Sequence, residues 1–250
     1  MKKTLYASVL ALITIAAASL IITNSPSAKA KDTAIVGEPV LLELFTSQGC
    51  SSCPPADRLA ARLAREPGLV VISRPVDYWD RLGWKDTLAS PDNTALQRAY
   101  ARRGLGGYNG VYTPQTVVAG RHGEVGSDES AIREYASLTS RAERPAIRVR
   151  KLDGGGFGVG LGGDASRTAE LLLVGVVSRA VVDVGRGENR GRRIAYTNVL
   201  IDERPIGEWS GGKASHVIAP EQLRVPGADR YALMVREPGG GRVLAARWLS

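Results

Sequence analysis

The chain has 250 residues and a formal net charge of +8, which is enough sequence for two small domains or one large one. The positive charge comes mostly from arginines spread along the chain, whereas a nucleic-acid interface gathers basic and aromatic residues on one surface. We therefore expect a solvated basic surface and no nucleic-acid partner.

Residues 1–30 are typical of an export signal. A short basic start, MKK, precedes the apolar run LYASVLALITIAAASLII, and the small-residue pattern Ala28-x-Ala30 precedes the expected cleavage point. A retained membrane anchor is the alternative, because the run is about long enough to span a bilayer. We expect cleavage, no membrane span in the mature chain, and a secreted or periplasmic location, where disulfides are permitted.

Residues 31–144 alternate between strand-like and helix-like segments. VLLELFT, at 40–46, is nearly continuous in apolar residues, as in a strand covered on both faces. The proline pair that opens the next segment suits the first turn of a helix. The expected strands are 40–46, 69–76 and 116–119, and the expected helices are 55–64, 93–103 and 127–141 with Ser127 as N-cap. This order predicts a mixed α/β sheet.

The pattern changes after Pro145. AIRVRKL and FGVGL alternate in polarity on either side of the turn DGGG, which predicts a hairpin. Further strands are expected at 171–184, 194–201, 232–235 and 243–248, separated by turns such as PGADR and EPGGGR. Short strands with Gly/Pro turns predict a β-sandwich-like all-β domain over residues 145–250.

Both cysteines of the chain, Cys50 and Cys53, lie in FTSQGCSSCPPAD. A zinc site requires four ligands and the second pair is absent, so no bound metal is expected. Copper transfer, which needs fewer ligands, stays open. So does a structural disulfide, although closing so short a loop removes little chain entropy. A position between a strand and a helix favours redox chemistry, because the N–H groups and the dipole of the helix start stabilise a thiolate.

Two further segments stand out. Asp77, Tyr78, Trp79 and Asp80 follow the second expected strand at its carboxyl end, the edge at which α/β sheets place their sites. They predict a substrate groove near Cys50, with simple capping of the core as the alternative. The arginine-rich loop at 186–193 is interpreted as a solvated hairpin end, with an anion site as the alternative.

The N-terminal half resembles a thioredoxin-fold domain. More narrowly, ELFTSQGCSSCPPAD, VDYWDRLGWKD, YTPQTVVAG and RGENRGRR…YTNVLI are similar to motifs in a family of bacterial secreted thioredoxin-like proteins without an assigned function. The resemblance implies a cis bond between Thr113 and Pro114 beside the cysteines, with Thr113 presenting a partner peptide. It also implies a buried acid before the cysteines. Glu43 is the nearest match, one residue further from Cys50 than usual, and an ordinary strand glutamate is the alternative.

We therefore expect an α/β thioredoxin-like domain at 31–144, followed by a β-rich domain at 145–250, in an exported thiol–disulfide oxidoreductase. Cys50 attacks and Cys53 resolves the mixed disulfide. We expect the chemistry in the first domain, and the alternative is that the arginine loop at 186–193 leans over the pair and helps to hold the Cys50 thiolate. No small cofactor is needed, and the partners are protein thiols, protein disulfides or another redox protein. The redox role follows only by analogy of fold. The alternative is a secreted binding module that keeps the fold and a structural disulfide but transfers no electrons.

Overall fold

The computed structural model describes residues 38–108 and 110–249. The described residues form one compact unit, and the expected export signal at 1–30 lies outside them. Within the described part of the chain, no helix is long and apolar enough to cross a membrane.

Strands make up most of the regular structure. They are β1 (Val40–Thr46), β2 (Leu69–Pro75), β3 (Gln115–Val118), β4 (His122–Val125), β5 (Ala146–Lys151), β6 (Phe157–Gly162), β7 (Ala169–Asp183), β8 (Arg193–Trp209), β9 (Ala214–Ile218), β10 (Arg230–Arg236) and β11 (Val243–Trp248). The helices are α1 (Pro54–Leu63), α2 (Pro91–Tyr100) and α3 (Glu129–Arg141), with short helical turns η1 (Asp80–Leu82), η2 (Ala101–Leu105) and η3 (Pro220–Leu223).

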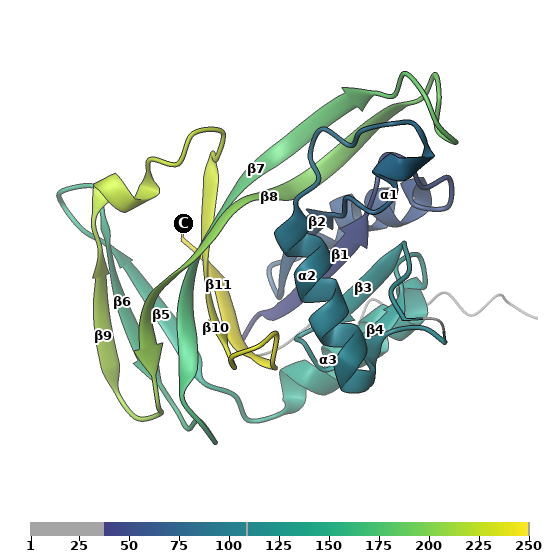
Figure 1. Cartoon of the computed structure of the whole chain (residues 1–250). Helices are drawn as coiled ribbons and strands as arrows, with labels where there is room; N and C mark the ends of the chain where they lie inside the picture. The colour runs from purple at the N-terminus through teal and green to yellow at the C-terminus, as the bar shows by residue number, and fades with distance from the viewer. Residues whose placement is uncertain (1–37, 109, 250) are drawn as a thin grey trace, which may run out of the picture. The chain divides into compact units, whose positions relative to one another are not determined.

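A large mixed sheet runs through the unit in the order β11-β10-β7-β8-β2-β1-β3-β4 (Figure 1). β1 pairs in parallel with β2 and antiparallel with β3. β7 and β8 form a long antiparallel hairpin. Its tip extends past the neighbouring strands and lies beside the start of α1 (Figure 1).

Helices cover both faces of the β1–β4 end of this sheet. Because successive residues of a strand face opposite ways, Leu42 and Leu44 of β1 pack against α1 and α3. Phe45 lies on the other face. Its ring packs edge to face against the ring of Tyr100 in α2, with the two ring centroids 6.0 Å apart. The loop at residues 47–53 therefore joins a strand that is buried on both sides to the first turn of α1.

A second, three-stranded sheet, in the order β5-β6-β9, packs against the far end of the large sheet. Alternate residues of its strands point inward and meet apolar side chains of β7, β10 and β11. The shared core includes Ile147, Val159, Leu161, Leu171, Leu173, Trp209, Ile218, Leu233, Val235 and Leu244.

The expected mixed α/β class is confirmed in its general form, a large mixed sheet with a second small sheet. Sequence reasoning missed β4 and β9 and gave β8 a length of eight residues instead of Arg193–Trp209. The N-cap of α3 is Asp128 rather than Ser127, and its carboxylate accepts a hydrogen bond from the Ala131 N–H at 3.0 Å.

The expected boundary between residues 144 and 145 falls in the loop between α3 and β5. Strands from both sides of it belong to the same large sheet. They also share a core, in which Leu41 and Ile72 pack with Leu172, Val174 and Met234. The two predicted halves are therefore parts of one compact unit.

The halves meet at a seam between β2 and β8, whose parallel ladder joins Ser73 to Val199. Side chains supply further links to the backbone across it. The Ser73 hydroxyl donates to the Thr197 carbonyl at 2.8 Å, and the Asn198 amide donates to the Val71 carbonyl at 2.9 Å. Asn198 has a positive φ of 48°, a conformation that asparagine tolerates better than most residues.

A buried charge cluster lies beside this seam. Glu43 of β1 accepts hydrogen bonds from Arg74 of β2 at 2.7 Å, Arg236 of β10 at 2.6 Å and the Tyr100 hydroxyl at 2.5 Å. Glu203 of β8 accepts from the same two arginines. Burial acts to raise the pKa of Glu203, but the two guanidinium groups outweigh it and hold that pKa at about 2. The negative charges of the two glutamates thus neutralise the positive charges of the two arginines, and the four residues come from four different strands.

We predict that Glu43→Gln lowers the free energy of unfolding by roughly 3–5 kcal/mol, because removing one partner leaves buried guanidinium charge unpaired. Urea unfolding of the oxidised protein measures this, with Glu208→Gln, exposed on β8, as control. A loss no larger than that of the control would show that the cluster does not hold the strands together.

Candidate functional site

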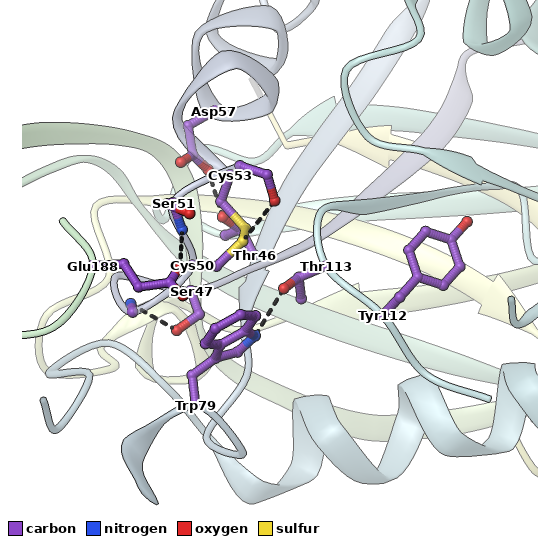
Figure 2. The surroundings of a disulfide bond; sticks show 12 residues. Thr46, Ser47, Cys50, Ser51, Cys53, Asp57, Trp79, Tyr112, Thr113 and Glu188 are labelled. Atoms are coloured by element: carbon purple, nitrogen blue, oxygen red, sulfur yellow. Dashed lines mark hydrogen bonds between the residues drawn. A yellow bond between two sulfur atoms is a disulfide. The ribbon is translucent and has the colours of Figure 1, made fainter. Parts of the chain in front are cut away.

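Cys50 and Cys53 form a disulfide in the turn between β1 and α1 (Figure 2). Cys53 is the residue that precedes the first turn of α1. Both cysteines have an exposed fraction of 0%, whereas Ser51 and Ser52 between them are exposed. The disulfide is therefore covered although the loop that carries it is at the surface.

Part of the cover comes from the segment that sequence reasoning assigned to a substrate groove. The indole N–H of Trp79 donates to the Thr113 hydroxyl at 2.8 Å (Figure 2). A Cβ atom at Gly49 would lie only 3.1 Å from the Trp79 Cβ. Trp79 thus bridges the turn before Cys50 and the turn before β3. The Thr113–Pro114 bond is cis, as expected.

The other predicted groove residues serve local structure. Asp77 accepts a hydrogen bond from Thr94 of α2 at 2.6 Å, and Asp80 accepts from the Asp86 N–H at 3.0 Å. Tyr78 packs in the cluster around α2, where burial raises its pKa to about 12. Of the four, Trp79 is the one that reaches the disulfide loop.

The stretch after η1 holds the same loop from a second side. Asp86 accepts a hydrogen bond from the Gln48 N–H at 2.7 Å. The Trp84 indole donates to the Gln48 side chain at 2.8 Å.

The third contact comes from the β7–β8 turn, residues 184–192. The side-chain amide of Asn189 donates to the carbonyls of Gln48 at 2.9 Å and Cys50 at 2.8 Å. The Glu188 carboxylate accepts from the Ser51 N–H at 2.9 Å (Figure 2), and hydrogen bonds from Ser51 lower the pKa of Glu188. A turn outside residues 31–144 therefore contacts the disulfide loop, as in the alternative in which the arginine loop at 186–193 leans over the cysteine pair.

The start of α1 offers a thiolate fewer donors than expected. Pro54 and Pro55 have no N–H, and the Ser51 N–H is bound to Glu188. The Ser52 hydroxyl lies 3.4 Å from the Cys50 sulfur and is a polar group within reach of it. Stabilisation of a Cys50 thiolate by the helix start is therefore weak.

A buried carboxyl group, Asp57, lies one helical turn beyond Cys53 (Figure 2). Its exposed fraction is 2%. One oxygen accepts from the Thr46 hydroxyl at 2.8 Å, and the other finds no hydrogen-bond partner among the described residues. Burial raises the pKa of Asp57 to about 7, although the bond from Thr46 acts in the opposite direction.

A pocket of about 520 Å³ opens next to this carboxyl group. It lies between the first turn of α1 and the start of β8. Its lining comprises Pro54, Asp57, Arg58, Arg192, Arg193, Ile194 and Ala195. The pocket gives solvent a path towards Asp57.

Glu43, the expected proton relay, belongs to the charge cluster described above, and both its oxygens are occupied there. It is a buried ion-pair partner between strands, which differs from both the expected relay and an ordinary strand glutamate. Sequence reasoning missed Asp57, because an acid in the first turn of a helix is ordinarily an exposed partner of the helix dipole. It also missed Asn189, because the arginines around it indicated a solvated loop.

The family model described as "Protein of unknown function (DUF1223)" matches residues 41–236. The crystal structure of protein AGR_C_4864 from Agrobacterium tumefaciens is similar, with 28% identity and a TM-score of 0.73, over 85% of this chain and 94% of that one. HBP35 of Porphyromonas gingivalis has a similar fold at 13% identity, with a TM-score of 0.53, over 85% of this chain and 74% of that one. No curated protein matches the chain.

Asp57 makes stability depend on pH. Its folded-state pKa of about 7 lies above the ordinary value of 3.8, so the folded state binds this proton more tightly than the unfolded chain does. Its contribution is therefore favourable at low pH and is lost as the pH rises to 7 and beyond.

We predict that Asp57→Asn increases the free energy of unfolding at pH 8 by roughly 1–4 kcal/mol and flattens its decline between pH 4 and pH 8. Urea unfolding with the disulfide intact measures this. Asp153→Asn, in an exposed turn, is the matched control. An Asp57→Asn profile parallel to that of the wild type would contradict the burial of a titrating carboxyl group.

Proposed function

The chain belongs to the DUF1223 family, and we propose that it is an exported thiol–disulfide oxidoreductase built on a thioredoxin-like arrangement of β1 to α3. The active pair is Cys50 and Cys53. Export follows from the signal-like sequence of residues 1–30. The partners are protein thiols or disulfides, or another redox protein.

The arrangement of the site supports a thioredoxin-like reading. A C-x-x-C pair ends the turn between a buried parallel strand and a helix. Thr113 and Pro114, which precede β3, are linked to the disulfide loop through Trp79. An incoming extended peptide would meet Thr113 and Trp79 at this edge.

The observation that carries the proposal is Asp57. A buried carboxyl group with an unpartnered oxygen is costly in free energy and contributes little to packing. Such groups occur preferentially at functional sites, where a pKa close to neutrality suits proton transfer. Asp57 follows Cys53 by one helical turn and borders the pocket of about 520 Å³, so it is placed to exchange protons with the resolving cysteine.

In the reductive direction, the Cys50 thiolate attacks a partner disulfide, forms a mixed disulfide and releases one partner thiolate, which takes up a proton. Cys53 then loses its proton to Asp57. Its thiolate attacks the Cys50 sulfur and restores the Cys50–Cys53 disulfide; the second partner thiolate leaves and takes up the proton held by Asp57. Two electrons and two protons pass from the dithiol to the partner.

The surroundings of Cys50 favour the reductive direction, in which the protein reduces a partner disulfide. A strong oxidant stabilises its reduced form through a thiolate of low pKa. Here the helix start lacks two N–H groups, and Glu188 occupies a third. We infer a reduction potential closer to that of thioredoxin, about −270 mV, than to that of the oxidant DsbA, about −120 mV.

A second function, a binding module with a structural disulfide, is favoured by one observation. Both sulfurs have an exposed fraction of 0%, and a thiolate must reach a sulfur atom to exchange with it. The two functions differ in the stability of the disulfide towards physiological thiols.

The reduction potential of the Cys50–Cys53 pair separates the two functions. It is measured by equilibration in dithiothreitol redox buffers, followed by alkylation and mass spectrometry. We predict a potential above about −300 mV, the range below which structural disulfides ordinarily lie. In the reduced protein at pH 6–7, Cys50 should react with iodoacetamide faster than Cys53. A potential below that limit, with no turnover of a protein disulfide such as insulin, would establish the structural alternative.

A further inference from the structure

We propose that the β7–β8 turn, residues 184–192, is a displaceable cap on the Cys50–Cys53 disulfide, with Asn189 and Glu188 as the residues that position it. Its biological meaning rests on the proposed oxidoreductase function. Access of a small reductant to the disulfide tests the cap independently of that function.

The first step is the burial of the sulfurs. Thiol exchange requires a thiolate to approach a sulfur atom along the S–S axis. Ser51 and Ser52 are exposed, but neither cysteine is. Some element must move before a partner can react. Trp79 and the β7–β8 turn are two segments that contact the disulfide loop.

Trp79 is the less mobile of the two. Its ring is packed in the cluster around α2, and its N–H is bound to Thr113. The turn is held differently. Beyond the last ladder pair, Asp183 and Arg193, its links to the disulfide loop are side-chain hydrogen bonds from Asn189 and Glu188.

Val184 anchors the foot of the turn in an apolar cluster with Ile194 and Tyr196, so the part that can lift is the tip, residues 185–191. On one flank Gly185 lies against the Trp84 ring, so close that a Cβ there would be 2.9 Å from the ring. On the other flank, Arg192 and Arg193 border the pocket of about 520 Å³ beside α1. The tip residues Arg186, Glu188 and Arg190 are exposed. Segments with few buried contacts open locally at low free energy while the rest of the fold persists.

The cap is also coupled to the redox state. Glu188 places a carboxylate on the N–H of Ser51, the residue next to Cys50. A thiolate on Cys50 has the same charge, whereas the disulfide is neutral. The contact therefore favours the oxidised form, and by reciprocity reduction loosens the cap while displacement of the cap eases reduction.

The test is the second-order rate of reduction of the disulfide by dithiothreitol at pH 7, followed by quenching with acid and mass spectrometry. Asn189→Ala removes both bonds to the loop carbonyls and should accelerate reduction about tenfold, since each is a buried hydrogen bond. Glu188→Gln, at an exposed contact, should accelerate it about two- to threefold and make the reduction potential less negative. Asp183→Asn changes the same charge at the exposed base of the hairpin and should leave both quantities unchanged.

Two further measurements decide the matter if Asn189→Ala does not fold. Gly185→Ala pushes the turn away from Trp84 and should also accelerate reduction. Hydrogen exchange of the wild type should show the amide of Ser51, whose hydrogen bond crosses to Glu188 of the turn, exchanging far faster than those of the β7–β8 ladder, and faster again after reduction.

Unchanged reduction rates in folded Glu188→Gln and Gly185→Ala, or equal protection of the Ser51 amide and the ladder, would overturn the cap. If the variants react faster with dithiothreitol but the protein never reduces a protein disulfide, the cap stands and the oxidoreductase function falls. If the protein reduces a protein disulfide and the variants react with dithiothreitol at the wild-type rate, the oxidoreductase function stands and the cap falls.

Discussion

The balanced cluster of buried charges beside the β2–β8 seam is the interaction on which the rest of the structure depends. Glu43, Arg74, Glu203 and Arg236 come from four strands on both sides of that seam. Unpaired charges cannot remain in such an interior, so each strand has one register in which the cluster is complete. The backbone ladder at the seam is short, and the cluster and the Asn198 amide supply what the ladder lacks.

This constraint explains why the site is composite. Once β8 is fixed beside β2, the β7–β8 hairpin must extend over the end of β1 at which α1 begins. Asn189 then reaches the carbonyls of Gln48 and Cys50 across about 140 residues of sequence. The same placement of β8 against α1 buries Asp57 and so shifts its pKa. A distant strand therefore shapes both the access to the disulfide and the acid beside it.

Much of the local structure was predictable because local patterns determine it. The continuous apolar run at 40–46 predicted a strand buried on both faces, and Pro-Pro predicted a helix start within one residue of α1. The turn chemistry after Pro145 predicted the hairpin of β5 and β6. What a sequence cannot reveal is which strands pair over long distances. The pairing of β2 with β8 decides whether Glu43 is a relay or an ion-pair partner, and whether residues 186–193 are solvated or bound to the disulfide loop.

The change of composition near residue 145 correctly indicated a change of secondary structure. It did not indicate whether the residues after it fold as a separate domain. The shift marks the end of the helices, since the part from β5 onwards is almost entirely strands. Strand composition alone does not distinguish a separate sandwich from strands that extend an existing sheet. Leu41, Ile72, Leu172 and Met234 share one core, so the later strands extend the existing sheet.

The most direct test of the account's central claim is to trap the mixed disulfide that a redox-active pair must form. Cys53→Ser and Cys50→Ser are each incubated with a peptide that contains a strained disulfide, quenched with acid and analysed by mass spectrometry. The account predicts that Cys53→Ser accumulates a covalent adduct at Cys50, because the resolving thiol is absent, and that Cys50→Ser accumulates far less. Absence of an adduct in both folded variants, or equal adducts at both cysteines, would contradict the assignment of Cys50 as the nucleophile of an oxidoreductase.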